Sequence, residues 1–188
     1  MQTASRQGQQ PNSRQRQMAP VLAFGIGVAI LASAALGLSL SREESPPSSP
    51  VGQAAAQLTE TQASDRVVEI QTLLTRASQE RDVTLLPSVL TEDSPLNDIA
   101  RREIEQLIHD GVIDRSRLNT VSLQLRTNTP NEIVAIQQVA ISPKFILEKS
   151  GKDITDSEPI KQTVRWVLHP EDGEWQAFRI VVIKSGGA

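Results

Sequence analysis

The sequence is 188 residues long, which is enough for one ordinary domain with additional segments but too short for two full hydrophobic cores. It contains no cysteine and only two histidines, which excludes disulfides, thiol catalysis, and metal sites built from cysteines or several histidines. Aromatic residues make up 3%, tyrosine is absent, and the net charge is −3. These features argue against a surface that stacks or wraps nucleic acid.

An uncharged run over residues 19–41 is predicted to be a transmembrane helix in contact with lipid. About 20 apolar residues, at roughly 1.5 Å per residue, span the roughly 30 Å hydrocarbon layer of a bilayer. Small residues four positions apart, such as Gly25 and Ala29, would allow two copies of this helix to pack closely, so a homodimer formed through this helix remains an open alternative. The alternative is a signal cleaved near Ala34, which would release a secreted domain. A typical signal core of about 7–15 residues is shorter than this run, which favours a retained anchor.

Charges on either side of this run predict its orientation. Residues 1–18 are predicted to be a disordered tail whose only charges are arginines, whereas Glu43 and Glu44 follow the run. The positive-inside rule places the basic tail in the cytosol and the rest in the periplasm, the thylakoid or another extracytoplasmic space. Residues 42–63, rich in Pro, Ser, Ala and Gln, are predicted to be a linker that holds the domain away from the bilayer.

Residues 64–184 are predicted to form one domain that begins with helices. Ser64 is expected to be the N-cap of the first helix, because apolar residues then recur at helical spacing. A second helix is expected with Ser94 as its cap, Pro95 at its first position and Gly111 at its end. Its predicted buried stripe is Leu96, Ile99, Ile104, Leu107 and Ile108.

After Gly111 the apolar period changes to two, which predicts strands. The predicted strands are residues 121–126, 132–141, 160–169 and 175–183, followed by a tail at 185–188. A continuation of the second strand past Pro143 to Leu147 is left open. Turn residues separate them, among them Asp172 and Gly173 before the last strand. The sequence therefore predicts an α+β fold of two or three helices followed by four antiparallel strands.

The last predicted hairpin carries Gly173-Glu174-Trp175 beside its turn. With helices before the sheet, residues 64–184 resemble the nuclear-transport-factor-2-like (SnoaL-like) superfamily of cone-shaped domains. The resemblance implies helices packed in a curved four-stranded antiparallel sheet. An anchor followed by such a domain is also similar to VirB8-type secretion subunits and to membrane-tethered Tim44-like and plastid-division domains. That similarity implies a non-catalytic module that binds other proteins.

No constellation of catalytic residues is evident, and we expect no catalytic site, metal or cofactor. Catalytic members of the superfamily place an Asp/His or Tyr/Asp set inside the cone, and this chain has no tyrosine. His109 is expected to lie in the last turn of a helix, where a cation meets the helix dipole favourably. Asp110 and Asp114 flank Gly111 and are expected to be solvated.

The candidate ligand-binding residues are Trp166, Trp175, Arg165 and His169. The two tryptophans are expected on neighbouring strands, either packed in the core or lining a ligand pocket. Of the two, Trp175 is the expected structural residue, Trp166 the expected pocket wall, and His169 a residue flanking the hairpin. Residues 62–184 hold 15 Lys and Arg against 19 Asp and Glu, so nucleic acid is not an expected partner.

Two functions remain open on these grounds. The first is a single-pass membrane protein, not an enzyme, whose extracytoplasmic domain binds protein subunits of a membrane complex as an assembly factor, scaffold or accessory subunit. The alternative is a membrane-tethered enzyme or small-ligand binder that uses the interior of the cone. The alternative requires a buried titratable residue that converges with Trp166 or Trp175 in a pocket.

Overall fold

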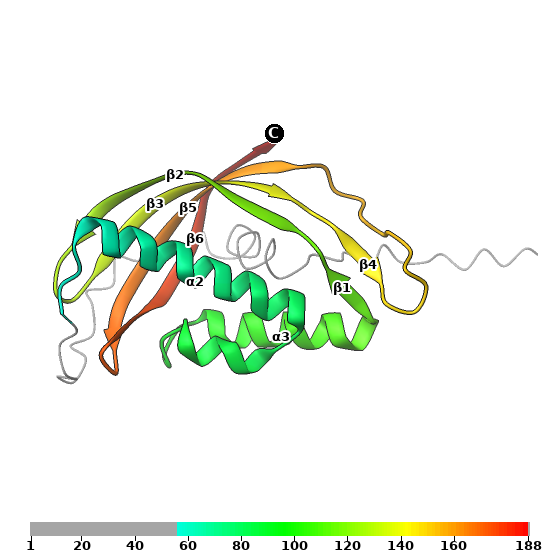
Figure 1. The fold of residues 1–188 in the computed structure, drawn as a ribbon, viewed down its shortest axis with the longest axis horizontal. Helices are drawn as coiled ribbons and strands as arrows, with labels where there is room; N and C mark the ends of the chain where they lie inside the picture. Colours follow the sequence, from blue (N-terminus) through cyan, green and yellow to red (C-terminus); the bar gives the residue numbers. More distant parts are fainter. Residues whose placement is uncertain (1–55, 188) are drawn as a thin grey trace, which may run out of the picture.

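The computed structural model describes residues 56–187 (Figure 1). The helices are α2 (Glu60–Glu80), the 3₁₀ helix η1 (Val83–Ser88) and α3 (Leu96–Asp110), and the strands are β1 (Val112–Asp114), β2 (Arg117–Asn128), β3 (Ile133–Ser142), β4 (Phe145–Leu147), β5 (Ile160–Glu171) and β6 (Glu174–Gly187). The expected tail at 1–18, the anchor at 19–41 and most of the linker at 42–63 lie outside the described residues. Among the helices of this part of the chain, none has the length and hydropathy to cross a bilayer.

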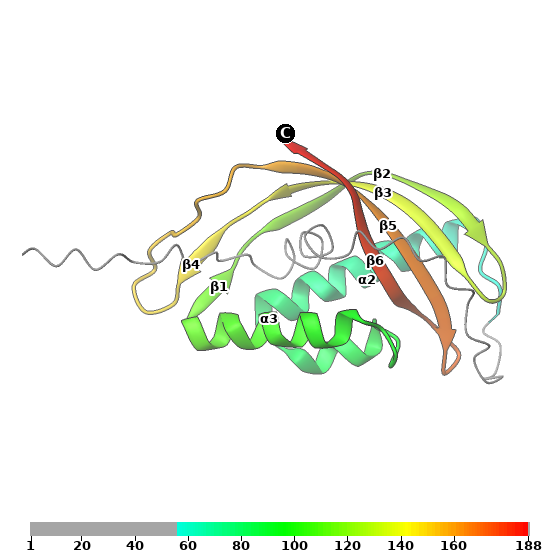
Figure 2. The ribbon, with the colours of Figure 1, turned by 180° about the vertical axis from the view of Figure 1, so that it is seen from behind.

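The four long strands form one antiparallel sheet in the order β2-β3-β5-β6, and β1 pairs with β4 in a separate ribbon. The sheet arches over α2 and α3, which lie on its concave side (Figures 1 and 2). Alternate residues of β5, including Val164, Trp166 and Leu168, face the helices and are buried. The expected α+β fold, with helices packed in a curved four-stranded antiparallel sheet, is therefore confirmed for the described residues.

Helix α2 begins at Glu60, with Thr59 as its N-cap, five residues before the expected cap Ser64. The side chain of Thr59 accepts a hydrogen bond from the backbone N–H of Gln62, and the side chain of Gln62 accepts one from the backbone N–H of Thr59. This reciprocal pair is a capping box, which satisfies two backbone donors at the helix start. Ser64, the predicted cap, lies within the helix, because the capping signature was hidden in a stretch whose composition resembles a linker.

The residues just before α2 also belong to the folded domain. Asn128, at the end of β2, donates from Nδ2 to the carbonyl of Leu58 at 2.9 Å. Gln57 donates from Nε2 to the carbonyl of Asn128 at 3.0 Å, and the side chain of Leu58 packs against the core. The predicted boundary at residue 64 is therefore too late by several residues.

A fragment that begins at residue 56 should accordingly be more stable than one that begins at Gln62. The shorter fragment lacks the Thr59 cap, both hydrogen bonds to Asn128 and the packing of Leu58. Loss of a cap alone costs about 0.5–2 kcal/mol, so we expect a total difference of about 2 kcal/mol. Urea unfolding of the two fragments measures the difference, and equal midpoints would contradict the role given to residues 56–61.

Helix α3 begins at Leu96, one residue later than predicted, with Pro95 rather than Ser94 at the N-cap position. The hydroxyl of Ser94 accepts from the backbone N–H of Leu96 at 3.2 Å and donates to the carbonyl of Phe178 at 2.9 Å. Gly111 ends the helix as predicted, in the left-handed conformation with φ 61° that glycine adopts readily. The buried stripe is rotated slightly from the prediction: Ala100 is fully buried, whereas Ile108 is 51% exposed.

The strands extend further than predicted at two places. Strand β6 continues to Gly187, so residues 185–187 of the predicted tail pair with the start of β5. The segment after Pro143 forms the separate strand β4, which pairs with β1 rather than extending β3. This ribbon has only three pairs of residues, too few for an alternating pattern to stand out in the sequence.

The C-terminal end of α2 is tied to the segment after β4 by an ion pair. Arg81, in the left-handed region with φ 58°, donates from both terminal nitrogens to the two carboxylate oxygens of Glu148, at 2.8 and 2.9 Å. These hydrogen bonds, assisted by the positive charge, hold the pKa of Glu148 below its ordinary value.

This pair predicts a pH dependence of stability. Because the pKa of Glu148 is lower in the folded chain, its contribution is present above the ordinary pKa and is lost as the pH falls through the folded value. The Glu148→Gln variant should therefore lose less stability than wild type between neutral and acidic pH. Unfolding in urea at a series of pH values measures this, and superimposable acid profiles for the two proteins would contradict it.

Candidate functional site

The four predicted ligand-binding residues do not converge on one site. Trp166 and Trp175 face the helices and are 1% and 3% exposed, as packed members of the core. Arg165 lies on the opposite, outer face of the sheet, because neighbouring residues of a strand point to opposite sides. His169 is on that outer face too, where its ring stacks on Phe178 with centroids 4.6 Å apart. The packed-core interpretation of both tryptophans is confirmed.

The indole of Trp166 belongs to a buried polar network. Its Nε1–H donates to Oε1 of Gln137 at 2.8 Å. Nε2 of Gln137 donates to Oε1 of Gln71 at 2.6 Å and to the hydroxyl of Thr120 at 2.8 Å. The network thus joins α2 to strands β2, β3 and β5; Trp166 and Gln137 lie in the interior, whereas Thr120 is exposed at the surface.

The two glutamines of this network were not identified from the sequence. Gln71 is 7% exposed and Gln137 is fully buried. Each does break a pattern in the sequence: Gln71 follows Ile70 on the apolar side of the first helix, and Gln137 stands where the alternation of β3 calls for an apolar residue. A glutamine on a predicted buried face is a signal for a side chain with buried partners.

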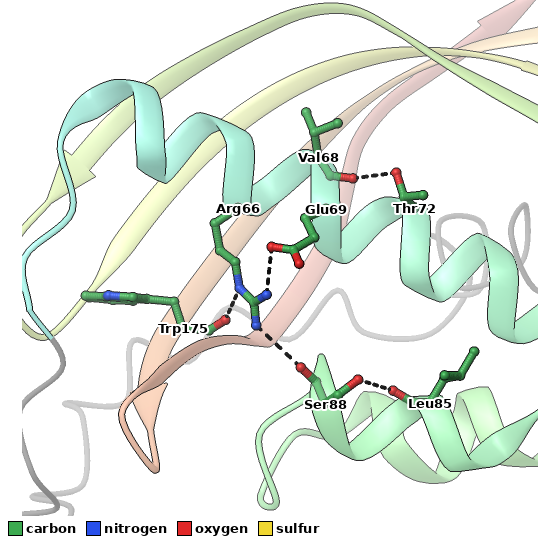
Figure 3. Close-up of polar contacts among 7 residues, drawn as sticks. All are labelled: Arg66, Val68, Glu69, Thr72, Leu85, Ser88 and Trp175. Carbon is green, nitrogen blue, oxygen red and sulfur yellow. Dashed lines mark hydrogen bonds and ion pairs between the residues drawn. The ribbon is translucent and has the colours of Figure 1, made fainter.

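Trp175, at the start of β6, is fixed through its backbone by Arg66 of α2 (Figure 3). Nε of Arg66 donates to the carbonyl of Trp175 at 2.6 Å, while a terminal nitrogen lies 3.4 Å from the carbonyl of Ser88. The other terminal nitrogen pairs with Glu69 at 2.8 Å. The Arg66 side chain is only 13% exposed, so one guanidinium connects α2, the end of η1 and the edge of the sheet.

The same edge of β6 is covered further along by the chain after η1. The backbone N–H of Ala177 donates to the carbonyl of Val89 at 2.8 Å, and the N–H of Thr91 donates to the carbonyl of Ala177 at 3.2 Å. Together with Arg66, these bonds occupy the first half of the β6 edge. That half is therefore not available for pairing with an added strand.

Asp114 is buried, and the expectation that it is solvated is wrong. It is the last residue of β1, and its side chain has no exposed area. Its carboxylate accepts from the hydroxyl of Ser78 at 2.7 Å and from the backbone N–H of Ser116 at 2.8 Å. This is a buried titratable group of the kind that the enzymatic alternative requires. Its hydrogen bonds, however, go to α2 and to the β1–β2 connection, and to neither tryptophan.

The histidines lie apart from each other. His109 is in the last turn of α3, as predicted, with its side chain 82% exposed and Nδ1 2.9 Å from a carboxylate oxygen of Asp110. Two side-chain hydrogen bonds lower the pKa of Asp110, the larger effect coming from Gln106 and the smaller from His109. Within residues 56–187, no three His, Asp or Glu side chains are grouped closely enough to hold a metal ion.

The outer face of the sheet has an uneven charge. The four long strands carry six basic residues, all of them exposed: Arg117, Arg126, Lys161, Arg165, Arg179 and Lys184. We call these six the outer cationic set. The only acidic residues in these strands, Glu171 and Glu174, lie at the β5–β6 turn. The remaining described residues hold 9 Lys and Arg against 18 Asp and Glu, so the helices and loops are acidic while the sheet is basic.

The outer cationic set has no ionic partners inside the domain. The ion pairs among residues 56–187 involve Arg66, Arg76, Arg81 and His109, and no member of the set. The guanidinium of Arg179 lies 5.6 Å from the ring centre of Phe178, a contact that leaves its hydrogen-bond donors open. These cations are therefore available to an external anion.

Two grooves open at the surface of the described part. The larger, about 470 Å³, lies between α2 and β2 and is lined by residues that include Val68, Thr72, Gln79, Leu118 and Asn119. The smaller, about 250 Å³, lies at the end of the sheet and is lined by residues that include Val121, Lys161, Gln162, Thr163 and Lys184. Neither groove includes any of the four predicted ligand-binding residues.

Known proteins resemble this chain in structure rather than in sequence. No protein-family model and no curated protein matches the sequence. The intermembrane space region of the chloroplast protein ARC6 has a TM-score of 0.52 at 13% identity, over 67% of this chain and 97% of that chain. A nuclear-transport-factor-2-like superfamily protein from Salmonella enterica serovar Typhimurium has a TM-score of 0.49 at 12% identity, over 69% and 94% of the two chains. LinA has a TM-score of 0.45 at 13% identity, over 67% and 86%.

At these identities the likeness concerns the fold alone. The similarity to VirB8-type and Tim44-like domains stays a prediction, as does the membrane anchor before the domain. The described part of the chain shares the α+β fold of the ARC6 intermembrane space region, and the resemblance to the nuclear-transport-factor-2-like superfamily stays a prediction.

Proposed function

We propose that this chain is a non-catalytic, single-pass membrane protein whose extracytoplasmic domain binds a protein subunit of a membrane complex. The observation that carries the proposal is the outer cationic set, six exposed basic residues without an ionic partner within residues 56–187. Arginine is enriched at protein interfaces because its planar group binds carboxylates with two parallel hydrogen bonds, and four of the six residues are arginines.

The interior supports binding at the surface over chemistry inside the cone. The hydrogen bonds of Trp166, Gln137 and Gln71 are made within one buried network, and both carboxylate oxygens of Asp114 accept bonds from serine residues. A catalytic group needs an open approach to its substrate. The uncharged run at 19–41 and the likeness to a domain from an intermembrane space support tethering to a membrane.

The topology has a direct test. The full-length chain is produced with a tag after residue 188, and sealed right-side-out vesicles are treated with protease. We expect degradation of the domain at 56–187, and a variant that lacks residues 1–41 should be absent from the washed membrane fraction. Full protection of the domain, or recovery of the full chain only in the soluble fraction, would overturn the proposed tethering.

Partner binding is tested on the same tagged protein. We expect purification in dodecyl maltoside from membranes of the source organism to retain one protein at a constant stoichiometric ratio, and raised salt to release it because the surface is cationic. Recovery of the chain alone from cells that contain its natural partners would overturn the proposed function.

A further inference from the structure

Four members of the outer cationic set form a regular row along strands β5 and β6. Lys161 and Arg165 belong to β5, and Arg179 and Lys184 belong to β6. We call these four residues the basic ladder. Each lies on the outer face opposite a residue without charge, so no two cations are directly paired across the strands: their partners are Gly186, Val181, Val167 and Thr163 respectively.

The register gives the ladder a period. From the lysine end, the rows of the β5–β6 pair present Lys161, then Lys184, then Arg165, then Arg179, with a step of two β5 residues between rows. Two residues of a strand advance about 7 Å, so the four cations span about 20 Å and alternate between the two strands. Two register shifts in β6, at Ile183 and Phe178, bring Lys184 and Arg179 onto this face.

The period of the ladder matches the side-chain period of an extended peptide. In an extended chain, every second residue points to the same side and the spacing is again about 7 Å. We therefore propose that the basic ladder binds an extended acidic segment of a partner protein, with carboxylates at every second residue, laid along β5 and β6. This inference rests on the proposed function, because it gives the chemistry of the partner segment for the same surface.

The surroundings of the ladder favour a flexible polypeptide over a second copy of this chain or a lipid bilayer. A second copy of this chain docked through the same face would bring the same cations against each other, which is repulsive. A bilayer is nearly flat on this scale, whereas the outer face is the convex side of an arched sheet (Figure 2). A flexible segment can follow that curvature and reach all four cations.

The small groove lies at the lysine end of the ladder and gives the segment an anchoring point. Lys161 and Lys184 line it together with Val121, whose side chain is 58% exposed. An apolar side chain of the bound segment would cover Val121.

The test uses the full-length chain in neutral dodecyl maltoside micelles and two fluorescein-labelled 12-residue peptides. One peptide alternates Glu and Thr, and the other has the same composition in two blocks. We expect fluorescence anisotropy to show at least fivefold tighter binding of the alternating peptide, because only its carboxylates repeat at the ladder spacing. Equal affinities for the two peptides would overturn the proposal, since net charge alone would then explain binding.

A pair of matched variants locates the binding surface. The ladder variant carries Lys161→Gln, Arg165→Gln, Arg179→Gln and Lys184→Gln; the control carries Arg101→Gln, Arg115→Gln, Lys149→Gln and Lys152→Gln, which are also exposed and make the same change in charge. We expect the ladder variant to bind the alternating peptide at least tenfold more weakly and the control to change less than threefold. Equal losses in the two variants would overturn the proposal. The peptide comparison on the wild-type chain decides the matter if the ladder variant does not fold.

Three further results separate this inference from its alternatives. If phosphatidylglycerol in the micelles displaces the alternating peptide at an equal concentration of charge, the face binds lipid and the proposal is wrong. If the ladder variant still retains the natural partner in full, the basic ladder is not the binding surface for that partner, while the proposed function stands. If the chain retains no partner but discriminates the two peptides, the ladder stands and the proposed function is wrong.

Discussion

Trp166→Ala is expected to destabilise the domain by about 3–5 kcal/mol, the range for removing a large buried aromatic side chain. Trp166 is 1% exposed, and its removal leaves a cavity between β5 and the helices. It also removes the donor that satisfies Oε1 of Gln137, a fully buried amide. Since small domains are stable by only about 5–15 kcal/mol, we expect poor expression as well as a lower midpoint of urea unfolding.

Two further variants separate the cavity from the lost hydrogen bond. Trp166→Phe keeps most of the ring but not the Nε1–H, so we expect a loss of about 1–3 kcal/mol from the unsatisfied oxygen of Gln137. Adding Gln137→Leu to Trp166→Phe removes the buried acceptor, while Oε1 of Gln71 keeps the hydroxyl of Thr120 as a donor at 3.3 Å. The double change should therefore recover part of that loss. If Trp166→Ala left the unfolding midpoint unchanged but abolished binding of a ligand, Trp166 would be a pocket wall after all.

The elements that could be predicted from the sequence were those with clear start, stop and turn residues and a regular apolar pattern. The second helix was placed within one residue because Ser94 and Gly111 are unambiguous start and stop signals. The turn of the β5–β6 hairpin was also placed correctly, because Asp172 and Gly173 both take positive φ there and apolar alternation flanks them, although both strands are longer than predicted. In both cases local sequence and tertiary packing favour the same structure.

The basic ladder could not be predicted from the sequence, because it depends on how the strands pair. The arginines of the strands are far apart in the sequence, and residues 165 and 179 become neighbours only through the register of β5 and β6. That register includes two shifts in β6, which no periodicity argument predicts. Charge balance over the whole domain was acidic and concealed the basic sheet, since the excess of acids lies in the helices and loops.

The buried carboxylate was missed because β1 is only three residues long. With so few residues, the alternation that turns Val112 and Asp114 inward cannot be recognised, and a polar residue after Gly111 looks like part of a loop. The partner strand β4 lies more than 30 residues further along the chain. Burial of Asp114 is thus a tertiary effect with no local signal.

Asp114→Ala is expected to destabilise the domain by about 3 kcal/mol or more. The change leaves two buried donors without an acceptor, the hydroxyl of Ser78 and the backbone N–H of Ser116, and each such group costs about 1–3 kcal/mol. Both serines have no exposed area, so water cannot replace the carboxylate without a rearrangement of β1 against α2. Urea unfolding of the full domain from residue 56 measures the loss.

Asp114→Asn is the control that keeps the shape. Its amide oxygen still accepts from the N–H of Ser116, and its amide nitrogen can donate to the hydroxyl oxygen of Ser78, so we expect a smaller loss of about 1–2 kcal/mol. Removal of Ser78 alone, as Ser78→Ala, should cost less than Asp114→Ala because one donor disappears together with its need for an acceptor. A structural carboxylate predicts this order of the three variants. An Asp114→Ala protein as stable as wild type would contradict this order. A buried carboxylate without a role in stability would then favour the enzymatic alternative.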